Sequence, residues 1–188
     1  MSGFLLARRQ ILVGIAACAA PAIWTSPAEA TIARALTTRQ LVRASGRVVR
    51  GTPVERFSTW ENARGRRRIV THTRVLVDED LARPHDEREV LVLTWGGRVG
   101  DVAQLAHGEA ALQVGEESVL FLTEERGGER RVTAMAQGHY PLERVGSDLV
   151  LRRSPQLPEL VDRKDAAVDR LVARRLGDAS RLIQEALR

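Results

Sequence analysis

The sequence has 188 residues, 44% of them hydrophobic and 28% charged, values that suit one globular domain and leave too few residues for two. The net charge is +5 at pH 7, yet all but one of the 29 basic residues are arginine. These arginines alternate with acidic residues and have few aromatic residues among them, which argues against nucleic acid as a partner.

The N-terminus predicts an export signal over residues 1–30. Arg8 and Arg9 precede an apolar run, and Ala28-Glu29-Ala30 forms a small-residue cleavage site before Thr31. The arginine pair resembles a twin-arginine signal, and the general secretory route is the alternative. We therefore expect a released protein in the periplasm or outside the cell.

A second interpretation of the same segment is a lipid anchor, because Ile15-Ala16-Ala17-Cys18 resembles a lipobox with Cys18 as the acylated residue. Cys18 is the only cysteine, so the exported domain is expected to have neither a disulfide nor a thiolate metal site. The apolar run is interrupted by Pro21 and is too short to span a bilayer of about 30 Å.

The first elements after the signal are a short helix and a bent strand. Residues 36–44 predict a helix with Thr37 or Thr38 as its N-cap. Residues 47–57 predict a long strand with a bulge at Gly51-Thr52-Pro53. A polar hairpin connection over residues 58–65 is expected next.

Alternating apolar residues mark the second strand, and a charged loop over residues 78–88 follows it. One face of this strand carries Ile69, Thr71, Thr73, Val75 and Val77. Residues 89–95 predict the third strand, which stops at Gly96-Gly97. Residues 98–115 are expected to be irregular, with at most one helical turn over residues 102–106.

The central strand of the predicted sheet is Ser118–Leu122, whose Val119 to Leu122 form the most apolar short run of the exported part. A fifth strand is expected over residues 130–136, followed by a hairpin of residues 142–145 and 149–152. Residues 160–188 predict a helix with a kink at Gly177-Asp178. We expect the helix to pack on the domain before Gly177 and to be looser after it.

Taken together, the elements predict a mainly β (α+β) fold: a small five-stranded OB-like barrel with a short N-terminal helix and a C-terminal helix. The predicted divisions are a signal peptide at 1–30, the barrel domain at 31–156 and a helical extension at 157–188.

The order of motifs resembles that of exported bacterial OB-like β-barrel proteins of uncharacterised function. The shared features are an opening helix, a bent Val-rich strand, Gly96-Gly97, Gly115-Glu116 before Val119–Leu122, and Gln137-Gly138. They cover residues 36–153. The arrangement is more distantly similar to netrin-like domains of metalloprotease inhibitors. Those use an N-terminal cysteine against zinc, and the expected mature chain has no cysteine, so this resemblance implies only a secreted barrel that binds a protein.

No catalytic signature stands out in the sequence. His72, His85, His107 and His139 are scattered, and no serine lies in a nucleophile elbow. We therefore expect a non-enzymatic binding or accessory module without a cofactor, whose partner is another exported protein. The alternative is a metal-binding protein or small hydrolase that uses His72, His107 or His139.

The predicted binding surface is a rim made of two stretches in which glycine stands beside an aromatic residue. These are Trp95-Gly96-Gly97 and Gln137-Gly138-His139-Tyr140. In the alternative interpretation Trp95 and Tyr140 cap the barrel and the glycines make room for them. Arg66, Arg67 and Arg68 predict a solvated hairpin tip, and binding to an anionic surface is the other possibility.

Overall fold

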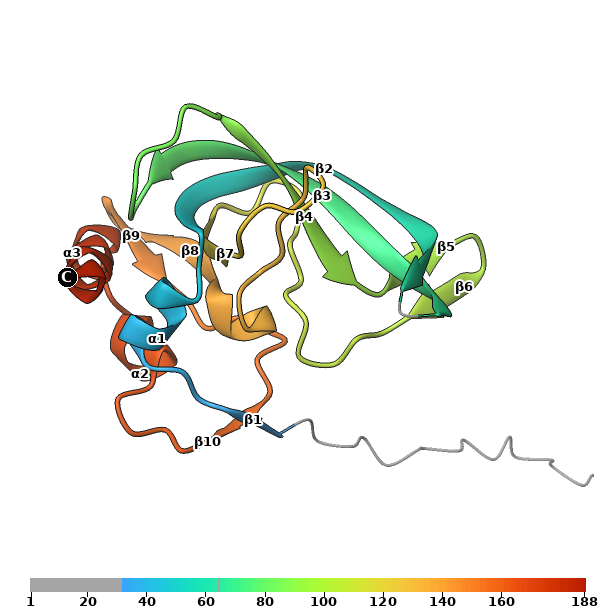
Figure 1. Ribbon diagram of the computed structural model, residues 1–188. Coiled ribbons are helices and arrows are strands. Elements are labelled where there is room, and N and C mark those ends of the chain that lie inside the picture. The colour runs from blue at the N-terminus through green and yellow to red at the C-terminus, as the bar shows by residue number, and fades with distance from the viewer. Residues whose placement is uncertain (1–31, 64) are drawn as a thin grey trace, which may run out of the picture.

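The computed structural model describes residues 32–63 and 65–188, and the predicted signal with Cys18, Ala30 and Thr31 lies outside this part (Figure 1). The described part is mainly β. No helix in it is long and apolar enough to cross a membrane. Its elements are β1 (Ile32–Arg34), α1 (Thr38–Arg43), β2 (Arg47–Ala63), β3 (Arg66–Asp80), β4 (Glu89–Trp95), β5 (Gly97–Val99), β6 (Val102–Gln104), β7 (Ser118–Leu122), a 3-10 turn (Met135–Gly138), β8 (His139–Val145), β9 (Asp148–Leu151), β10 (Glu159–Val161), α2 (Ala167–Leu171) and α3 (Leu176–Leu187).

The main sheet has six antiparallel strands in the order β4-β3-β2-β7-β8-β9. Two small two-stranded sheets accompany it: parallel β1-β10 and antiparallel β5-β6. The strands of the main sheet do not close into a barrel, so the expected closed five-stranded sheet is corrected to an open one of six strands.

The expected fifth strand over residues 130–136 is not a strand. It makes only isolated bridges, Arg130 with Val92 of β4 and Val132 with Leu122 of β7. Ala134 and Met135 then adopt positive φ values of 53° and 57°, which turns the chain into the 3-10 turn. The segment cannot continue as a strand beyond Thr133, because a left-handed backbone is incompatible with the extended conformation.

The long β2-β3 hairpin follows its predicted pattern and extends further than predicted. Register shifts occur between Arg50 and Gly51 and between Pro53 and Glu55, which confirms the bulge. A Cβ on Gly51 would lie 2.5 Å from the carbonyl oxygen of Leu76, so the strands approach too closely there for a larger residue. The strand continues through Trp60, and the expected polar connection is therefore mostly β2.

Helix α1 begins as its sequence predicts. The Thr37 hydroxyl accepts a hydrogen bond from the backbone N–H of Gln40, and the Gln40 side chain accepts one from the backbone N–H of Thr37. This reciprocal capping box satisfies two amides that a helix start leaves unpaired.

Strand β7 lies inside the molecule, and all five of its residues are buried. Val119 and Phe121 belong to one apolar core, shared with the helices, whereas Leu120 and Leu122 belong to a second core with residues of β3 and β4. The alternation of side chains along one strand thus supplies both cores. The prediction of a buried central strand is confirmed.

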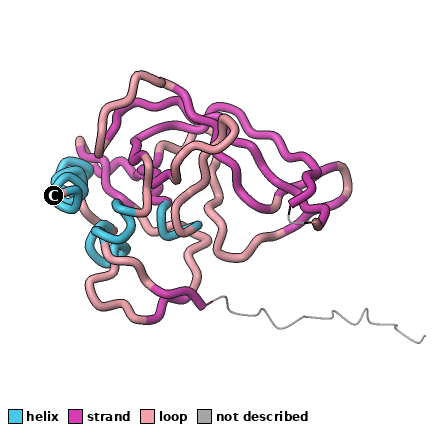
Figure 2. The backbone as a smooth tube through the Cα atoms, viewed as in Figure 1, coloured by secondary structure: helices cyan, strands magenta, loops and turns pink. Residues whose placement is uncertain are grey.

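The C-terminal segment differs from the predicted single helix. It divides into β10, α2 and α3, and Gly177 lies in the first turn of α3 instead of at a break. Residues after Gly177 are packed, since Ala179 and Ile183 have no exposed surface. The expected looseness beyond Gly177 is therefore wrong. All helices gather at one end of the molecule (Figure 2).

Candidate functional site

The first predicted rim stretch stands at the end of β4, where two glycines turn the chain into β5. Gly96 and Gly97 have φ values of 86° and 134°. A Cβ on Gly96 would lie 2.6 Å from the carbonyl oxygen of Gln104, and one on Gly97 would collide with the hydroxyls of Ser58 and Thr71. Only glycine fits both the backbone angles and the space. The β5-β6 hairpin consequently folds back directly over the sheet. Residues 98–115, expected to be irregular with at most one helical turn, thus begin with most of a two-stranded hairpin.

A groove of about 290 Å³ lies between the end of β4 and this hairpin. We call it the Trp95 groove; its lining includes Arg56, Thr71, Trp95, Gly96, Gly97, Ala103, Leu105 and Glu109. Thr71 donates a hydrogen bond of 2.7 Å to the carbonyl oxygen of Gly96, so part of the wall is polar and internally satisfied. Leu105 is 70% exposed and forms an apolar margin.

Arginine side chains lie over the indole of Trp95. The guanidinium carbon of Arg131 is 4.1 Å from the ring centroid and that of Arg68 is 5.7 Å from it. At the neighbouring Trp60, Arg67 lies at 4.8 Å. These are cation–π distances, and each such contact contributes about 0.5 to 1 kcal/mol at an exposed site. The contacts hold cationic groups in defined positions beside Trp60 and Trp95, and of these two tryptophans Trp95 lines the groove.

Glu109 forms the buried floor of this region. Its carboxylate accepts hydrogen bonds of 3.1 Å from the backbone N–H groups of Trp95 and Ala110. Burial raises the pKa of Glu109, while these hydrogen bonds and the nearby charge of Arg131 act in the opposite direction. Glu109 therefore fixes the end of β4 in place and is not itself presented to solvent.

The second predicted rim stretch lies inside the molecule. The amide side chain of Gln137 accepts a hydrogen bond from the backbone N–H of Leu36 and donates one to the carbonyl oxygen of Arg34. A Cβ on Gly138 would collide with the carbonyl oxygen of Thr133. Tyr140 is buried with its ring edge-on to Phe121 at 5.8 Å. Of the predicted residues, only Trp95, Gly96 and Gly97 line the groove.

His139 is buried between two serines. Its Nε2 lies 3.2 Å from Oγ of Ser118 and its Nδ1 lies 3.1 Å from Oγ of Ser154. Burial lowers the pKa of His139 to about 4, so the ring is neutral at pH 7. A neutral imidazole has one donor and one acceptor nitrogen, and hydroxyls can serve both. The ring ties β7, β8 and the segment after β9 together.

The other histidines have separate surroundings. His72 lies between carboxylates, with Nε2 2.9 Å from Glu61 and Nδ1 2.8 Å from Glu129, although the second pair is poorly aligned for a hydrogen bond. His85 lies 3.8 Å from Asp80, and His107 is exposed. Within residues 32–63 and 65–188, no three His, Cys, Asp or Glu side chains are grouped so that they could hold a metal ion.

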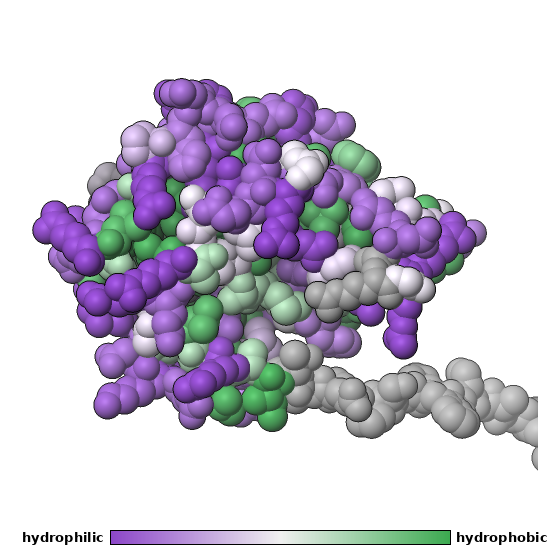
Figure 3. All heavy atoms as spheres, viewed as in Figure 1, coloured by the Kyte–Doolittle hydropathy of each residue, from purple (hydrophilic) through white to green (hydrophobic). Residues whose placement is uncertain are grey.

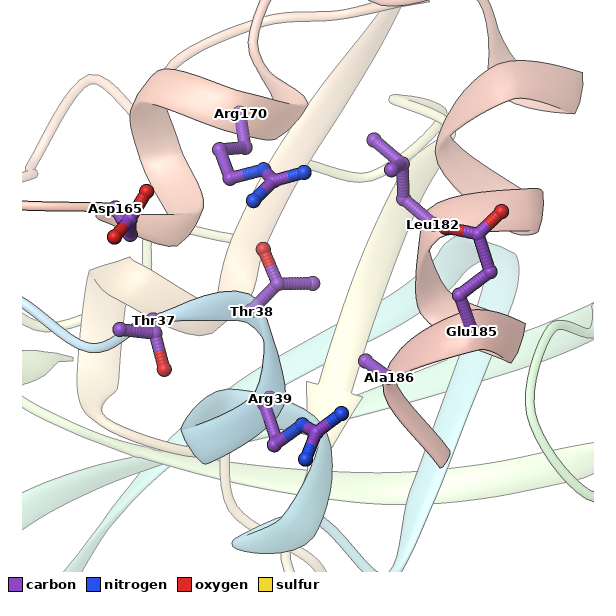
Figure 4. Close-up of a pocket in the computed structure, with 8 residues that line it drawn as sticks. All are labelled: Thr37, Thr38, Arg39, Asp165, Arg170, Leu182, Glu185 and Ala186. Carbon is purple, nitrogen blue, oxygen red and sulfur yellow. The ribbon is translucent and has the colours of Figure 1, made fainter. Parts of the chain in front are cut away.

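A second cavity of about 330 Å³ lies between α1, α2 and α3, at residues that no motif in the sequence had marked (Figure 4). Arg39 and Arg170 reach toward it from two helices, with Thr38 between them, and Asp165 and Glu185 also line it. The hydroxyl of Thr38 is buried and has no hydrogen-bond partner among the described residues. The charges of both signs on its walls give this cavity no clear preference for an anion or a cation.

The surface around these sites is mostly hydrophilic. In Figure 3 hydrophobic atoms form small separate areas on the visible face, one of them beside the grey trace, where β1 begins. Ile32 of β1 is 61% exposed.

Comparison with known proteins adds no relative: the chain matches no protein-family model, no curated protein and no solved structure.

Proposed function

We propose that the protein is an exported binding module without a catalytic role, and that it binds another exported protein at the Trp95 groove. The observation that carries this proposal is the construction of the groove. Two glycines that tolerate no side chain hold a hairpin over the end of β4, and a half-buried tryptophan there carries two arginines. Tryptophan and arginine are the residues most enriched among those that dominate binding energy at protein interfaces.

Export is part of the same proposal and is supported by the sequence of residues 1–30, with release after Ala30 and anchoring through Cys18 as the alternative.

The OB-like relationship is also a proposal. It is supported by Arg130, whose backbone N–H donates to the carbonyl of Leu91 while its own carbonyl accepts from Leu93, and by the amide of Thr123, which donates to the carbonyl of Arg131. These bonds connect the two halves of the open sheet without forming a strand.

The hydrolase alternative would need a reactive serine beside a histidine, and Ser118 and His139 are such a pair. Both side chains are 1% exposed, so a substrate has no path to them. A histidine with a pKa of about 4 is also a weak general base at neutral pH. The burial of this pair favours a structural role, and the open Trp95 groove is the better supported site.

The proposal is tested by affinity capture with Trp95→Ala. The mature protein is incubated with the exported protein fraction of its source, and bound proteins are identified by mass spectrometry. Val145→Ala is the matched control, because Val145 is an exposed apolar residue on β8 at a distance from the groove in sequence and sheet order. We expect wild type and Val145→Ala to capture the same partner and Trp95→Ala to lose it.

Thermal melting of all three proteins accompanies the capture, so that loss of binding is separated from loss of folding. Unchanged capture by a folded Trp95→Ala protein would remove the groove from consideration. Stoichiometric zinc or copper in the purified protein, lost on His139→Ala, would favour the metal-binding alternative.

A further inference from the structure

Strand β6 is an exposed sheet edge beside the Trp95 groove. It pairs with β5 on one side only within the described part of the chain, and all three of its residues are exposed. Val99 and Val102 flank the two-residue turn and form the hydrogen-bonded pair of the hairpin. The peptide groups of Ala103 consequently point away from β5, because hydrogen-bonding direction alternates along a strand.

The same edge carries apolar side chains that face water. Val102 is 50% exposed and Leu105 is 70% exposed, and Leu105 lines the groove together with Ala103. An unpaired strand edge with adjacent pockets is the arrangement by which proteins add a strand from a peptide. Backbone pairing supplies affinity there, and the pockets select side chains.

Arginines outnumber carboxylates at this end of the molecule, although exposed Asp101 lies in the turn between β5 and β6. Arg56, Arg68 and Arg131 border the groove or its tryptophan, and none of them forms an ion pair with a described carboxylate. Glu109 is buried and accepts two backbone amides, and Glu61 faces His72. Arginines without carboxylate partners also occur elsewhere, for example Arg144, but all three arginine–tryptophan contacts of the described residues are at this end.

We propose that the ligand of the Trp95 groove is an extended, acidic segment of a partner protein that pairs with β6 and places its carboxylates against Arg68 and Arg131. This inference rests on the proposed function and names the class of ligand. Guanidinium groups accept carboxylates through paired hydrogen bonds, and stacking on Trp95 holds two of them in advance.

A peptide fits this surface better than a nucleic acid or an acidic polysaccharide. Ala103 presents a backbone N–H and a carbonyl at the open edge of β6. Of the three ligand classes, only a peptide has backbone donors and acceptors with the spacing needed to pair with them. The exposed Val102 and Leu105 can also pack against apolar side chains of the peptide that lie between its acidic ones. Polyanions without such side chains would leave these groups facing water.

The experiment uses a fluorescein-labelled twelve-residue peptide of alternating Glu and Val, titrated with the mature protein and followed by anisotropy. The same peptide with Lys in place of Glu, an unlabelled heparin hexasaccharide and an oligothymidylate serve as comparisons. We expect binding of the Glu peptide only, with an affinity that falls as salt increases. The double variant Arg68→Gln, Arg131→Gln should weaken it roughly tenfold.

Two further variants separate charge from backbone pairing. Arg144→Gln combined with Arg188→Gln removes the same charge from exposed positions elsewhere and should leave the affinity unchanged. Ala103→Pro removes the outward N–H of β6 and should weaken binding at least as much as the arginine variant. Melting curves establish that each variant is folded.

The outcomes distinguish this inference from the proposed function. Trp95-dependent capture of an exported protein, without binding of the Glu peptide, overturns the inference and leaves the proposed function standing. Equal affinity for heparin or oligothymidylate also overturns it, by assigning the groove to polyanions in general. Capture that persists unchanged in a folded Trp95→Ala protein overturns the proposed function, and the inference with it.

Discussion

The two ends of the molecule differ in what their side chains do. At the helical end Leu41, Leu171 and Ile183 have no exposed surface, and they pack with α1, α2 and α3 against β7. At the strand end, formed by β5, β6 and the tip of β2-β3, apolar residues such as Leu105 face solvent and arginines stack on tryptophans. Figure 1 shows α1, α2 and α3 at the opposite end from β5 and β6. We infer from the two sets of side chains that the helical end supplies more of the stability and that the strand end is free to carry binding chemistry.

Strand β7 joins the two regions, because its residues alternate between the helix-covered core and the core beneath β3 and β4. Substitutions that affect the helical end should therefore unfold the whole protein. Substitutions at the strand end should change binding while the fold persists. The following experiments test that division, in order of decreasing effect.

Removal of residues 157–188 should have the largest effect. It deletes Leu160, Leu171 and Ile183 from the core and removes the strand that pairs with β1. Ile183→Ala alone should cost about 2 to 5 kcal/mol of unfolding free energy, so the truncation should abolish cooperative melting. Calorimetry measures both, with removal of Arg188 alone as the control. A truncated protein that melts where the full chain does would show that the helices are an appendage.

The buried ion pair of Arg47 should come next. Arg47 is 1% exposed, and its Nε donates a hydrogen bond of 2.7 Å to Oδ1 of Asp80. Asp80→Asn removes the nearer and more buried of the two carboxylates beside this guanidinium and should cost about 3 to 5 kcal/mol. Glu87→Gln, at the exposed carboxylate 3.3 Å from Arg47, should cost less than about 1 kcal/mol. Equal effects in urea titrations would contradict the assignment of Asp80 as the main partner.

The Asp80 carboxyl also contributes to acid sensitivity. Burial alone would raise the pKa of Asp80, but hydrogen bonds from Arg47 and from the amide of His85 outweigh it and the pKa is lowered. The ionised Asp80 carboxylate therefore stabilises the folded protein fully above the unfolded-state pKa. This stabilisation is lost as pH falls through the lower folded-state pKa.

His139 should make stability depend on pH in a higher window. The unfolded chain takes up a proton near pH 6.5, whereas the buried ring resists protonation down to about pH 4. The contribution of neutral His139 to the free energy of unfolding is fully present above pH 6.5 and is lost as pH falls toward 4. The total loss is about 3 kcal/mol, at 1.4 kcal/mol per pKa unit. Urea unfolding of wild type and His139→Gln at several pH values measures the difference, and parallel curves would exclude His139 as the cause.

Changes at the strand end should affect stability least. Arg68→Gln and Arg131→Gln remove surface charges and a stacking contact each, so each should shift unfolding free energy by no more than about 1 kcal/mol. The expected loss is in binding, as described above. A collapse of the melting temperature in either variant would mean that these arginines hold the fold together, and would remove the distinction between the two ends.

Much of the sheet could be predicted because its signals are local. The apolar run Ser118–Leu122 became the buried β7, the capping residue Thr37 begins α1, and Gly51 and Pro53 mark the bulges of β2. Strand β4 has the predicted ends, and the hairpin of β8 and β9 lies where it was expected. In each case residues within one element specify its structure.

The break in the C-terminal segment could not be predicted, because it depends on a distant strand. The amide of Ala173 donates to the carbonyl of Leu151 in β9, and the amide of Leu151 donates to the carbonyl of Arg174. These bonds compete with helix formation, and Ala173 adopts a φ of 62° without any glycine or proline to announce it. The sequence instead favoured Gly177, which tolerates a place inside α3.

The candidate site was predictable in part. The Gly-Gly pair after a strand identified Trp95, Gly96 and Gly97, because such a pair permits the backbone angles found there. Arg131 and Glu109 reach the same tryptophan from other segments, and no spacing in the sequence connects them. The similar-looking stretch Gln137–Tyr140 turned inward because its side chains bind the N-terminal segment and fill the core.

The pairing of β1 with β10 sets an order of events during folding. β1 begins at the first described residue, and its parallel partner β10 is made only after every strand of the main sheet has been synthesised. Gln137, which holds Leu36 and Arg34, is also far along the chain. Contacts so distant in sequence form slowly, because the intervening chain must be ordered first. Residues 34–36 therefore cannot meet Gln137, and β1 cannot pair with β10, until those later segments of the chain have been made.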